Sequence, residues 1–235
     1  MTLALYGKTR RRQGILVMLG LFAVFAALIG GVAVQKEAKA VSFTLSTTNG
    51  TFPSLSGGTC VVGLGTQEVH WGDTEGTGCP STANQSGYKW NGIPAADSFN
   101  DGETVYLGRF THFNRPINGG TSISGATMNV NLAFSAPGVV TAPITITLAH
   151  EETSNSGSYS NCAYQIAGDS TPCPDRVVPT VPAGTAFTVG AVQYTLQLVA
   201  FERDADGACP ALPTSETFTP SFVTAEGQEN WGCLY

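Results

Sequence analysis

The sequence predicts an all-β fold: a single antiparallel β-sandwich domain, jelly-roll-like in its strand arrangement, that follows an N-terminal signal helix. Short segments of alternating apolar and polar residues follow one another from residue 41 onward, as expected of half-buried strands. Turn-forming residues separate these segments, and the chain holds 28 Gly and 13 Pro. With 42% apolar and only 12% charged residues, the chain has enough apolar side chains for a folded core.

Residues 1–40 have the pattern of a signal peptide. A basic stretch from Lys8 to Arg12 precedes an uncharged apolar run over residues 14–34. Ala38 and Ala40 then place small residues at the −3 and −1 positions of a cleavage site. We therefore expect cleavage after Ala40, which leaves a mature chain that begins at the next residue.

The same apolar run is long enough to cross a bilayer as a helix, so an uncleaved membrane anchor is the alternative. In both cases the domain formed by residues 41–235 would lie outside the cytoplasm. Its charge is strongly negative. The first forty residues hold six of the eleven basic residues but one of the seventeen acidic ones, which leaves five basic against sixteen acidic residues, a formal charge of −11. This excess of acid excludes a nucleic-acid binder that relies on a basic surface.

All six cysteines lie after residue 40, and an even number of cysteines in an exported chain is typical of disulfide bonds. Proximity in the sequence favours the pairs Cys60–Cys79, Cys162–Cys173 and Cys209–Cys233. The other common use of cysteine, as a metal ligand, is disfavoured because the chain has no CxxC and no HxxxH spacing. We therefore predict three disulfides and no metal site built on the cysteines.

Two alternating runs predict a β-hairpin near the middle of the domain. Residues 126–134 place five apolar side chains on one face, and residues 144–148 alternate in the same way. An Ala-Pro-Gly sequence between the runs supplies the turn. A second hairpin is predicted over residues 186–201, turning at Gly190-Ala191. Its return strand would place Val192, Tyr194, Leu196 and Leu198 on one side.

Earlier in the chain, Asn91-Gly92 lies between apolar residues and predicts a third hairpin turn, because this dipeptide suits a tight two-residue turn. The segment 104–113 differs from the others because it carries large apolar side chains on both faces. Such a strand is expected in the middle of a sheet or buried on both sides.

The histidines offer little evidence of catalysis. We expect His112, which Phe110 and Phe113 flank, to be a core or turn histidine whose ring nitrogens bind backbone groups, and His150 to be exposed to solvent. No Gly-x-Ser-x-Gly sequence is present. We predict no catalytic residue and no enzymatic activity. An enzyme would require His112 and an acidic residue to share a cleft.

Two acidic loops and one aromatic residue are the candidate binding residues. Asp101 and Glu103 flank a glycine, and Asp204 and Asp206 precede another. Such oxygen-rich loops suit calcium, although the glutamate that completes an EF-hand loop is missing, and ordinary polar turns are the alternative. Tyr159, within a Ser- and Gly-rich loop, is the expected exposed aromatic for stacking on a sugar. No other cofactor is predicted.

The sequence Thr-His-Phe-Asn-Arg-Pro-Ile, with Thr111, His112, Asn114, Pro116 and Ile117 as its defining positions, lies between Trp71-Gly72 and a terminal Leu234-Tyr235. In this order these elements resemble the choice-of-anchor K domain, also described as the THxN family of exported bacterial proteins. The resemblance implies a β-rich, exported domain of a bacterial surface and implies no catalytic residue. From the residues themselves, we expect the strand to leave the sheet here, with Asn114 bonding its own backbone before a proline-fixed turn.

These observations together predict an exported, non-enzymatic domain, secreted or held at the cell surface of a bacterium. The expected partners are surface polysaccharide or matrix proteins. Nucleic acid is not expected, and a membrane would be contacted only through residues 14–34 if the signal segment stays in place. A carbohydrate- or calcium-binding module is the alternative, with the two acidic loops meeting at one end of the sandwich.

Overall fold

The structure is a computed structural model, and it describes residues 6–7, 40–74, 78–155, 158–170, 172–180, 185–189, 191–197, 201–204, 208–209 and 221–235. The predicted signal helix lies outside these residues. Only Tyr6–Gly7 of that segment are described, and they form a short strand, β1, that pairs with Tyr194 and Thr195. No helix among the described residues is long and apolar enough to cross a membrane.

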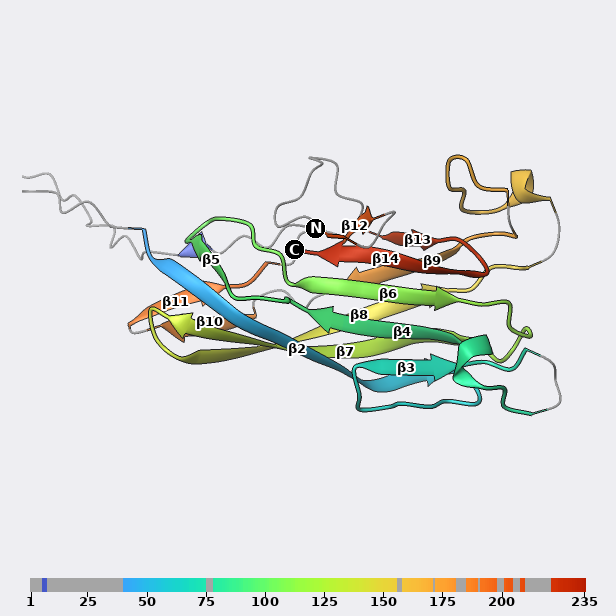
Figure 1. Cartoon of the computed structure of the whole chain (residues 1–235), viewed down its shortest axis with the longest axis horizontal. Coiled ribbons are helices and arrows are strands. Elements are labelled where there is room, and N and C mark those ends of the chain that lie inside the picture. The colour runs from blue at the N-terminus through green and yellow to red at the C-terminus, as the bar shows by residue number, and fades with distance from the viewer. Residues whose placement is uncertain are drawn as a thin grey trace, which may run out of the picture.

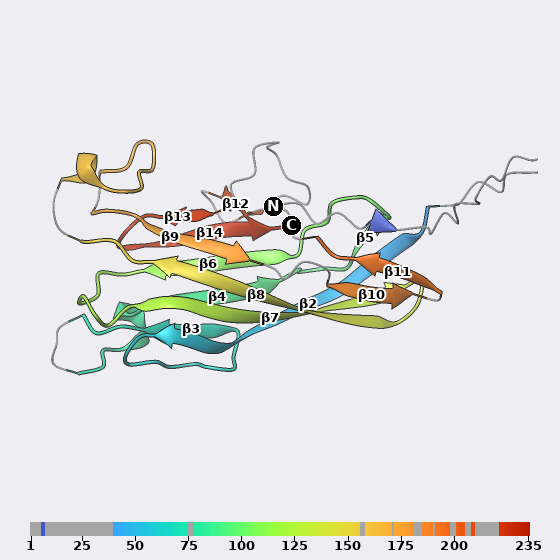
Figure 2. The same cartoon turned by 180° about the vertical axis from the view of Figure 1, so that it is seen from behind.

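Two antiparallel sheets pack face to face, which confirms the predicted β-sandwich (Figures 1 and 2). The five-stranded sheet has the order β12 (Phe201–Asp204), β14 (Gln228–Leu234), β6 (Gly108–Asn114), β4 (Ser86–Gly92) and β3 (Glu68–Trp71). The six-stranded sheet has the order β13 (Phe222–Thr224), β9 (Asp175–Thr180), β8 (Val140–Glu151), β7 (Ile123–Ala136), β2 (Ser42–Gly57) and β5 (Asp97–Asn100).

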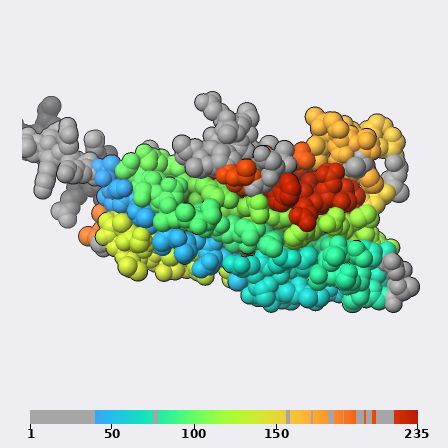
Figure 3. All heavy atoms as spheres, viewed as in Figure 1, coloured from blue at the N-terminus to red at the C-terminus, as the bar shows by residue number. Residues whose placement is uncertain are grey.

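A third, smaller sheet and two short turns complete the described fold. The hairpin of β10 (Ala186–Val189) and β11 (Val192–Thr195) forms, together with β1, a three-stranded sheet at one end of the sandwich (Figure 1). Two short 3₁₀ turns, η1 (Thr82–Asn84) and η2 (Tyr159–Asn161), lie in the connections. In the space-filling view, the five-stranded sheet presents a continuous surface from β3 in cyan to β14 in red (Figure 3).

The alternating pattern of the middle hairpin is confirmed. In β7 the side chains of Met128, Val130 and Leu132 are fully buried, and β8 buries every second residue from Ala142 onward. The two strands pair directly, with Phe134 opposite Val140 across the Ala-Pro-Gly turn. Apolar residues on these inward faces pack against Trp71, Tyr88 and Trp90 of the opposite sheet, and together they form one core, because each sheet is apolar on a single face.

The second predicted hairpin is also present, with Val189 opposite Val192. Tyr194 and Leu196 are buried as expected, whereas Val192 is 45% exposed. Val192 and Tyr194 are two positions apart in β11 and so lie on the same side of the strand, as predicted, but Val192 is next to the turn and is not buried. Leu198 lies outside the described residues.

The predicted turn at Asn91-Gly92 is wrong. Both residues continue β4 and pair with Arg109 and Gly108 of β6. A Cβ atom on Gly92 would lie 2.3 Å from the carbonyl oxygen of Thr48 in the other sheet. Glycine is therefore required here by the close approach of two strands and not by a turn.

The segment 104–113, which carries apolar side chains on both faces, divides into two parts. The strand β6 begins at Gly108 and lies between β14 and β4, which confirms the prediction of a central strand. Residues before it run outside the strand, although Val105 and Leu107 are buried all the same.

All six cysteines form the three expected disulfides: Cys60–Cys79, Cys162–Cys173 and Cys209–Cys233. Each bond closes a short stretch of chain, with sequence separations of 19, 11 and 24 residues respectively. Disulfides of this kind form and persist in oxidising compartments, so their presence indicates an extracytoplasmic setting.

Candidate functional site

Polar side chains gather in the interior of the sandwich, where β6 faces strands of the six-stranded sheet. We call this group the interior polar cluster, and its members are His112, His150, Glu152, Asp175, Thr224 and Glu226. Apart from Glu152, which is partly exposed, every member is at most 5% exposed. Polar groups are rarely buried without a structural or functional reason, because burial removes their hydrogen bonds to water.

The alternation of inward and outward side chains along the strands places these residues in the interior of the sandwich. In β8 the buried positions continue from Ile144, Ile146 and Leu148 to His150, so this histidine occupies the next inward position of the same face. In β6 the inward positions include Phe110 and His112, and both are fully buried. The prediction that His150 is exposed is therefore wrong, and the alternation of β8 was the signal that could have revealed its position.

The contacts of His112 favour the tautomer with the hydrogen on Nδ1. The Thr224 hydroxyl lies 3.4 Å from the backbone carbonyl of Asp175, to which it can donate its proton, and its oxygen lies 2.8 Å from Nδ1 of His112. An oxygen that donates to a carbonyl must accept from the imidazole, so Nδ1 carries the hydrogen. This leaves Nε2 with a lone pair, and Nε2 has no hydrogen-bond partner although it is buried.

Both nitrogens of His150 have partners. The Tyr88 hydroxyl lies 2.6 Å from Nδ1, and Oε2 of Glu152 lies 3.1 Å from Nε2. Burial raises the pKa of Tyr88 well above its usual value, with smaller contributions from Asp175 and Glu152, so the phenol keeps its proton and donates it. Nε2 of His150 then donates to the carboxylate of Glu152, and Nδ1 is the nitrogen with the lone pair.

Three carboxyl groups lie close together beside the histidines. One oxygen each of Glu152, Asp175 and Glu226 lies within 4.8 Å of the others. Oδ1 of Asp175 accepts a 2.7 Å hydrogen bond from the backbone N–H of Thr153, whereas its Oδ2 and both oxygens of Glu226 have no hydrogen-bond partner. A buried polar atom left without a partner costs about 1–3 kcal/mol, so this region is destabilising in the absence of a counter-charge.

The electrostatics of the interior polar cluster follow from burial. Burial, and then the charge of Glu152, raise the pKa of Asp175 well above its ordinary value and raise the pKa of Glu226 to about 7. Burial, and then His150, lower the pKa of His112 well below its ordinary value, so its ring is neutral at pH 7. The cluster thus combines the neutral imidazole of His112 with two carboxyl groups, those of Asp175 and Glu226, that resist ionisation.

Aromatic rings shield the interior polar cluster from solvent. The ring of Trp71 is parallel to that of His112 within 19°, and the centroids are 6.2 Å apart. Tyr88 packs edge-on against the same histidine at 5.1 Å, and the His112 and His150 rings are 5.3 Å apart. His112 and His150 are thus packed among aromatic rings between the two sheets.

The Thr-His-Phe-Asn-Arg-Pro-Ile sequence contributes directly to this interior. Thr111, His112, Asn114 and Ile117 are buried, whereas Pro116 is exposed. The predicted core position of His112 is confirmed, but its bonded nitrogen contacts a side-chain hydroxyl and not the backbone. The prediction that Asn114 bonds its own backbone is wrong, because its amide donates across the sandwich to the carbonyl of Thr224 at 3.2 Å.

His70 does not join the other two histidines. Its Nε2 lies 2.8 Å from a carboxylate oxygen of Glu68, and its ring stacks on Phe113 at 5.3 Å. Trp71 points into the core, so the preceding residue points to the outer face of the same sheet. The sequence alone shows no local spacing that distinguishes His70 from His112, and only the packing of the two sheets separates them.

The acidic loops behave as polar turns where they are described. The carboxylate of Glu103 accepts hydrogen bonds from the backbone and side-chain N–H groups of Asn100 at 2.7 and 3.1 Å, and these bonds lower the pKa of Glu103. Asp101 follows at the turn and its backbone N–H donates to the carbonyl of Val41. The backbone of Asp204 pairs with Trp231 in β12, while Asp206 lies outside the described residues.

The prediction that Tyr159 presents an exposed ring is wrong. Its side chain is half-buried, and its hydroxyl both donates to the carbonyl of Ile166 at 3.1 Å and accepts from the N–H of that residue at 2.6 Å. The ring thus fastens the loop closed by the Cys162–Cys173 disulfide.

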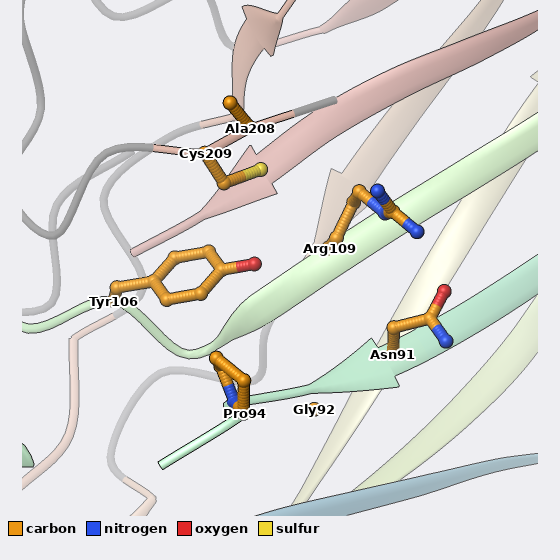
Figure 4. Close-up of a pocket in the computed structure, with 7 residues that line it drawn as sticks. All are labelled: Asn91, Gly92, Pro94, Tyr106, Arg109, Ala208 and Cys209. Carbon is orange, nitrogen blue, oxygen red and sulfur yellow. The ribbon is translucent and has the colours of Figure 1, made fainter. Parts of the chain in front are cut away.

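A surface pocket of about 360 Å³ lies beside the ends of β4 and β6 (Figure 4). It is lined by Asn91, Gly92, Pro94, Tyr106, Arg109, Ala208 and Cys209. The lining combines an aromatic ring with amide and guanidinium groups, a combination that suits polar ligands.

Compared with known proteins, the chain matches no protein-family model and no curated protein at a significant level.

Proposed function

We propose that residues 41–235 form an exported, non-enzymatic binding domain of the choice-of-anchor K type, which works at the surface of a bacterium or in its extracellular matrix. The observation that carries the proposal is the complete pairing of six cysteines in three disulfides. A cytoplasmic protein would be kept reduced, and disulfides there are rare and mostly catalytic. The basic and apolar pattern of residues 1–40 supports export independently.

The burial of the histidines supports a non-enzymatic role. Catalysis by His112 would need a substrate atom within hydrogen-bond distance of its ring. That ring is fully buried between the sheets, behind Trp71 and Tyr88. The residues with the richest chemistry therefore face the interior of the domain and not a surface cleft.

A test of export follows the chain in a bacterial host. The full chain is produced with a C-terminal tag, the cells are fractionated, and the product is alkylated without reduction and analysed by mass spectrometry. We expect a product outside the cytoplasm that begins at Val41 and has six unreactive cysteines. A product confined to the cytoplasm with alkylated cysteines contradicts the proposal.

The surface pocket of Figure 4 favours carbohydrate as a second candidate function. Sugar-binding sites commonly pair an aromatic ring with planar polar side chains, and Tyr106, Asn91 and Arg109 provide these groups here. A glycan array probed with wild type and Arg109→Ala tests this candidate. Glycan binding that the substitution abolishes supports the pocket, whereas the absence of any bound glycan removes this candidate.

A further inference from the structure

The interior polar cluster brings donor atoms from both sheets to one place. One ring nitrogen each of His112 and His150 and one carboxylate oxygen of Asp175 lie within 4.8 Å of one another. His112 belongs to β6 of the five-stranded sheet, whereas His150 and Asp175 belong to β8 and β9 of the six-stranded sheet. An ion bound by all three would therefore join the two sheets.

Hydrogen bonds hold each imidazole in the orientation that metal ligands usually have. Metal-binding histidines donate their N–H to a nearby acceptor, which fixes the ring and leaves the other nitrogen for the ion. Nδ1 of His112 uses Thr224 in this way, and Nε2 of His150 uses the Glu152 carboxylate. The two remaining nitrogens are the ones with lone pairs.

Unpartnered atoms provide independent evidence for a ligand. Nε2 of His112 and Oδ2 of Asp175 have no hydrogen-bond partner, and both side chains are 0% exposed. Beside them, the carboxyl groups of Glu152, Asp175 and Glu226 bring three potential oxygen ligands to one place. A divalent cation would supply partners for the unpaired atoms and would stabilise the ionised form of the carboxyl groups.

The donor types select the class of ion. Two imidazole nitrogens and a carboxylate oxygen suit Zn²⁺ and neighbouring divalent transition metals. Ca²⁺ instead prefers a shell of about 6–8 oxygen ligands. Zn²⁺ ligand bonds of roughly 2.0–2.2 Å require the donors to draw together when the ion binds. Nδ1 of His150 must also release the Tyr88 hydroxyl.

We propose that His112, His150 and Asp175 bind one divalent transition-metal ion, of the Zn²⁺ class, in the interior of the sandwich. The ion has a structural role, because it crosslinks the two sheets at a place that no disulfide reaches among the described residues. Glu152 acts as a positioning residue through His150, and Glu226 lies within reach as an additional carboxylate.

The first measurement uses the disulfide-bonded protein, freed of metal with a chelator that is then removed. Titration with ZnCl₂ in a calorimeter is expected to show one equivalent bound. In parallel, free Zn²⁺ at a hundred times Kd is expected to raise the melting temperature by roughly 5–10 °C. Millimolar CaCl₂ is expected to produce neither heat nor a shift.

Two substitutions and one matched control locate the ion. His112→Gln and Asp175→Asn are each expected to weaken Zn²⁺ binding by about 100-fold or more, because each removes a ligand. His70→Gln is the control, since His70 bonds the partly exposed Glu68 on the other face of the sheet, away from the interior polar cluster. Its Zn²⁺ affinity is expected to equal that of wild type. Tyr88→Phe frees Nδ1 of His150 and is expected to bind at least as tightly as wild type.

A spectroscopic readout on wild type keeps the test decisive if His112→Gln fails to fold. X-ray absorption of the Zn²⁺-loaded protein is expected to show two imidazoles in a shell of nitrogen and oxygen ligands. The proposal is overturned if no Zn²⁺ binds at about 100 μM, if the absorption spectrum shows fewer than two imidazoles, or if His70→Gln abolishes binding while Asp175→Asn retains it.

Discussion

The hydroxyl of Tyr88 lies 2.6 Å from Nδ1 of His150, and this hydrogen bond joins β4 of the five-stranded sheet to β8 of the six-stranded sheet. Both side chains are at most 5% exposed. The bond is thus one of several polar connections between the two layers, together with those from His112 and Asn114 to Thr224. Its removal would leave the imidazole nitrogen without a partner in the interior.

Tyr88→Phe is therefore expected to destabilise the metal-free domain. The substitution keeps the ring and its packing but leaves Nδ1 of His150 buried and unpaired, which costs about 1–3 kcal/mol. Urea unfolding followed by tryptophan fluorescence measures the change. Tyr164→Phe is the matched control, because the Tyr164 hydroxyl donates to the carboxylate of Glu151, which is 41% exposed. Its expected cost is under about 1 kcal/mol. Equal costs in the two variants would contradict the prediction.

Local patterns predicted the strands because a strand repeats every two residues and each sheet has one apolar face. The buried alternation of β7 and β8 followed from the residues alone. The disulfide pairs followed from proximity, since the paired cysteines are separated by only 19, 11 and 24 residues. The alternation of residues in β8 also indicated that His150 points inward, although a charged or polar residue at a strand end is more often exposed.

Contacts across the sandwich could not be predicted in this way. His112 meets Thr224, which is 112 residues later in the chain, and Asn114 reaches the same residue. No spacing rule connects positions so far apart. The misassigned turn has a similar cause: Asn91-Gly92 has turn chemistry, but Gly92 is required by the nearby backbone of Thr48. A glycine signals a turn and a close approach equally well.

Close packing also explains Gly50 in β2. A Cβ atom added to this glycine would lie 2.5 Å from Cδ1 of Trp90, and Trp90 is held in place by a 2.8 Å hydrogen bond from Nε1 to the carbonyl of Thr48. Gly50→Ala is therefore expected to cost about 1–3 kcal/mol through overpacking. Differential scanning calorimetry measures the loss of stability.

The control for this substitution is Gly119→Ala. A Cβ atom on Gly119 meets nothing within 4 Å, and its backbone does not have a positive φ. Its expected effect is within about 0.5 kcal/mol of wild type. A Gly50→Ala protein as stable as wild type would show that the indole can move aside.

The disulfides are expected to contribute unequally. In the chain-entropy description, a crosslink stabilises more when it closes a longer loop. Cys209–Cys233 has a sequence separation of 24 residues and Cys162–Cys173 one of 11. Removing the first bond by paired Cys→Ala substitutions is expected to cost about 3.5 kcal/mol, against about 3 kcal/mol for the second. Chemical unfolding of both variants measures the difference.

The environment of Cys233 increases the expected difference in stability loss between the two disulfides. Cys233 is fully buried and belongs to β14, the strand beside β6. Its replacement by alanine therefore also removes a buried sulfur from the core. A smaller loss of stability for Cys209–Cys233 than for Cys162–Cys173 would show that strain or residual structure outweighs both loop closure and burial.

Glu226 is expected to make the stability of the metal-free domain depend on pH. Its pKa is about 7 in the folded protein, raised chiefly by burial from an ordinary value of 4.5. Below pH 4.5 the carboxyl is protonated in both the folded and the unfolded states and contributes no difference. Between pH 4.5 and 7 the folded state keeps the proton and the unfolded state loses it, so stability falls as the pH rises. Above pH 7 the penalty is constant, at roughly 3 kcal/mol.

Glu226→Gln removes this titration and keeps the shape of the side chain. The variant is expected to be more stable than wild type by roughly 3 kcal/mol at pH 8 and about equally stable at pH 4. Urea unfolding at both pH values, with a chelator present to exclude bound metal, measures the two differences. Glu229→Gln, at an exposed position of β14, is the control and is expected to change stability by less than about 0.5 kcal/mol at either pH. A Glu226→Gln protein with the same pH dependence as wild type would show that the folded domain ionises this carboxyl as readily as the unfolded chain does.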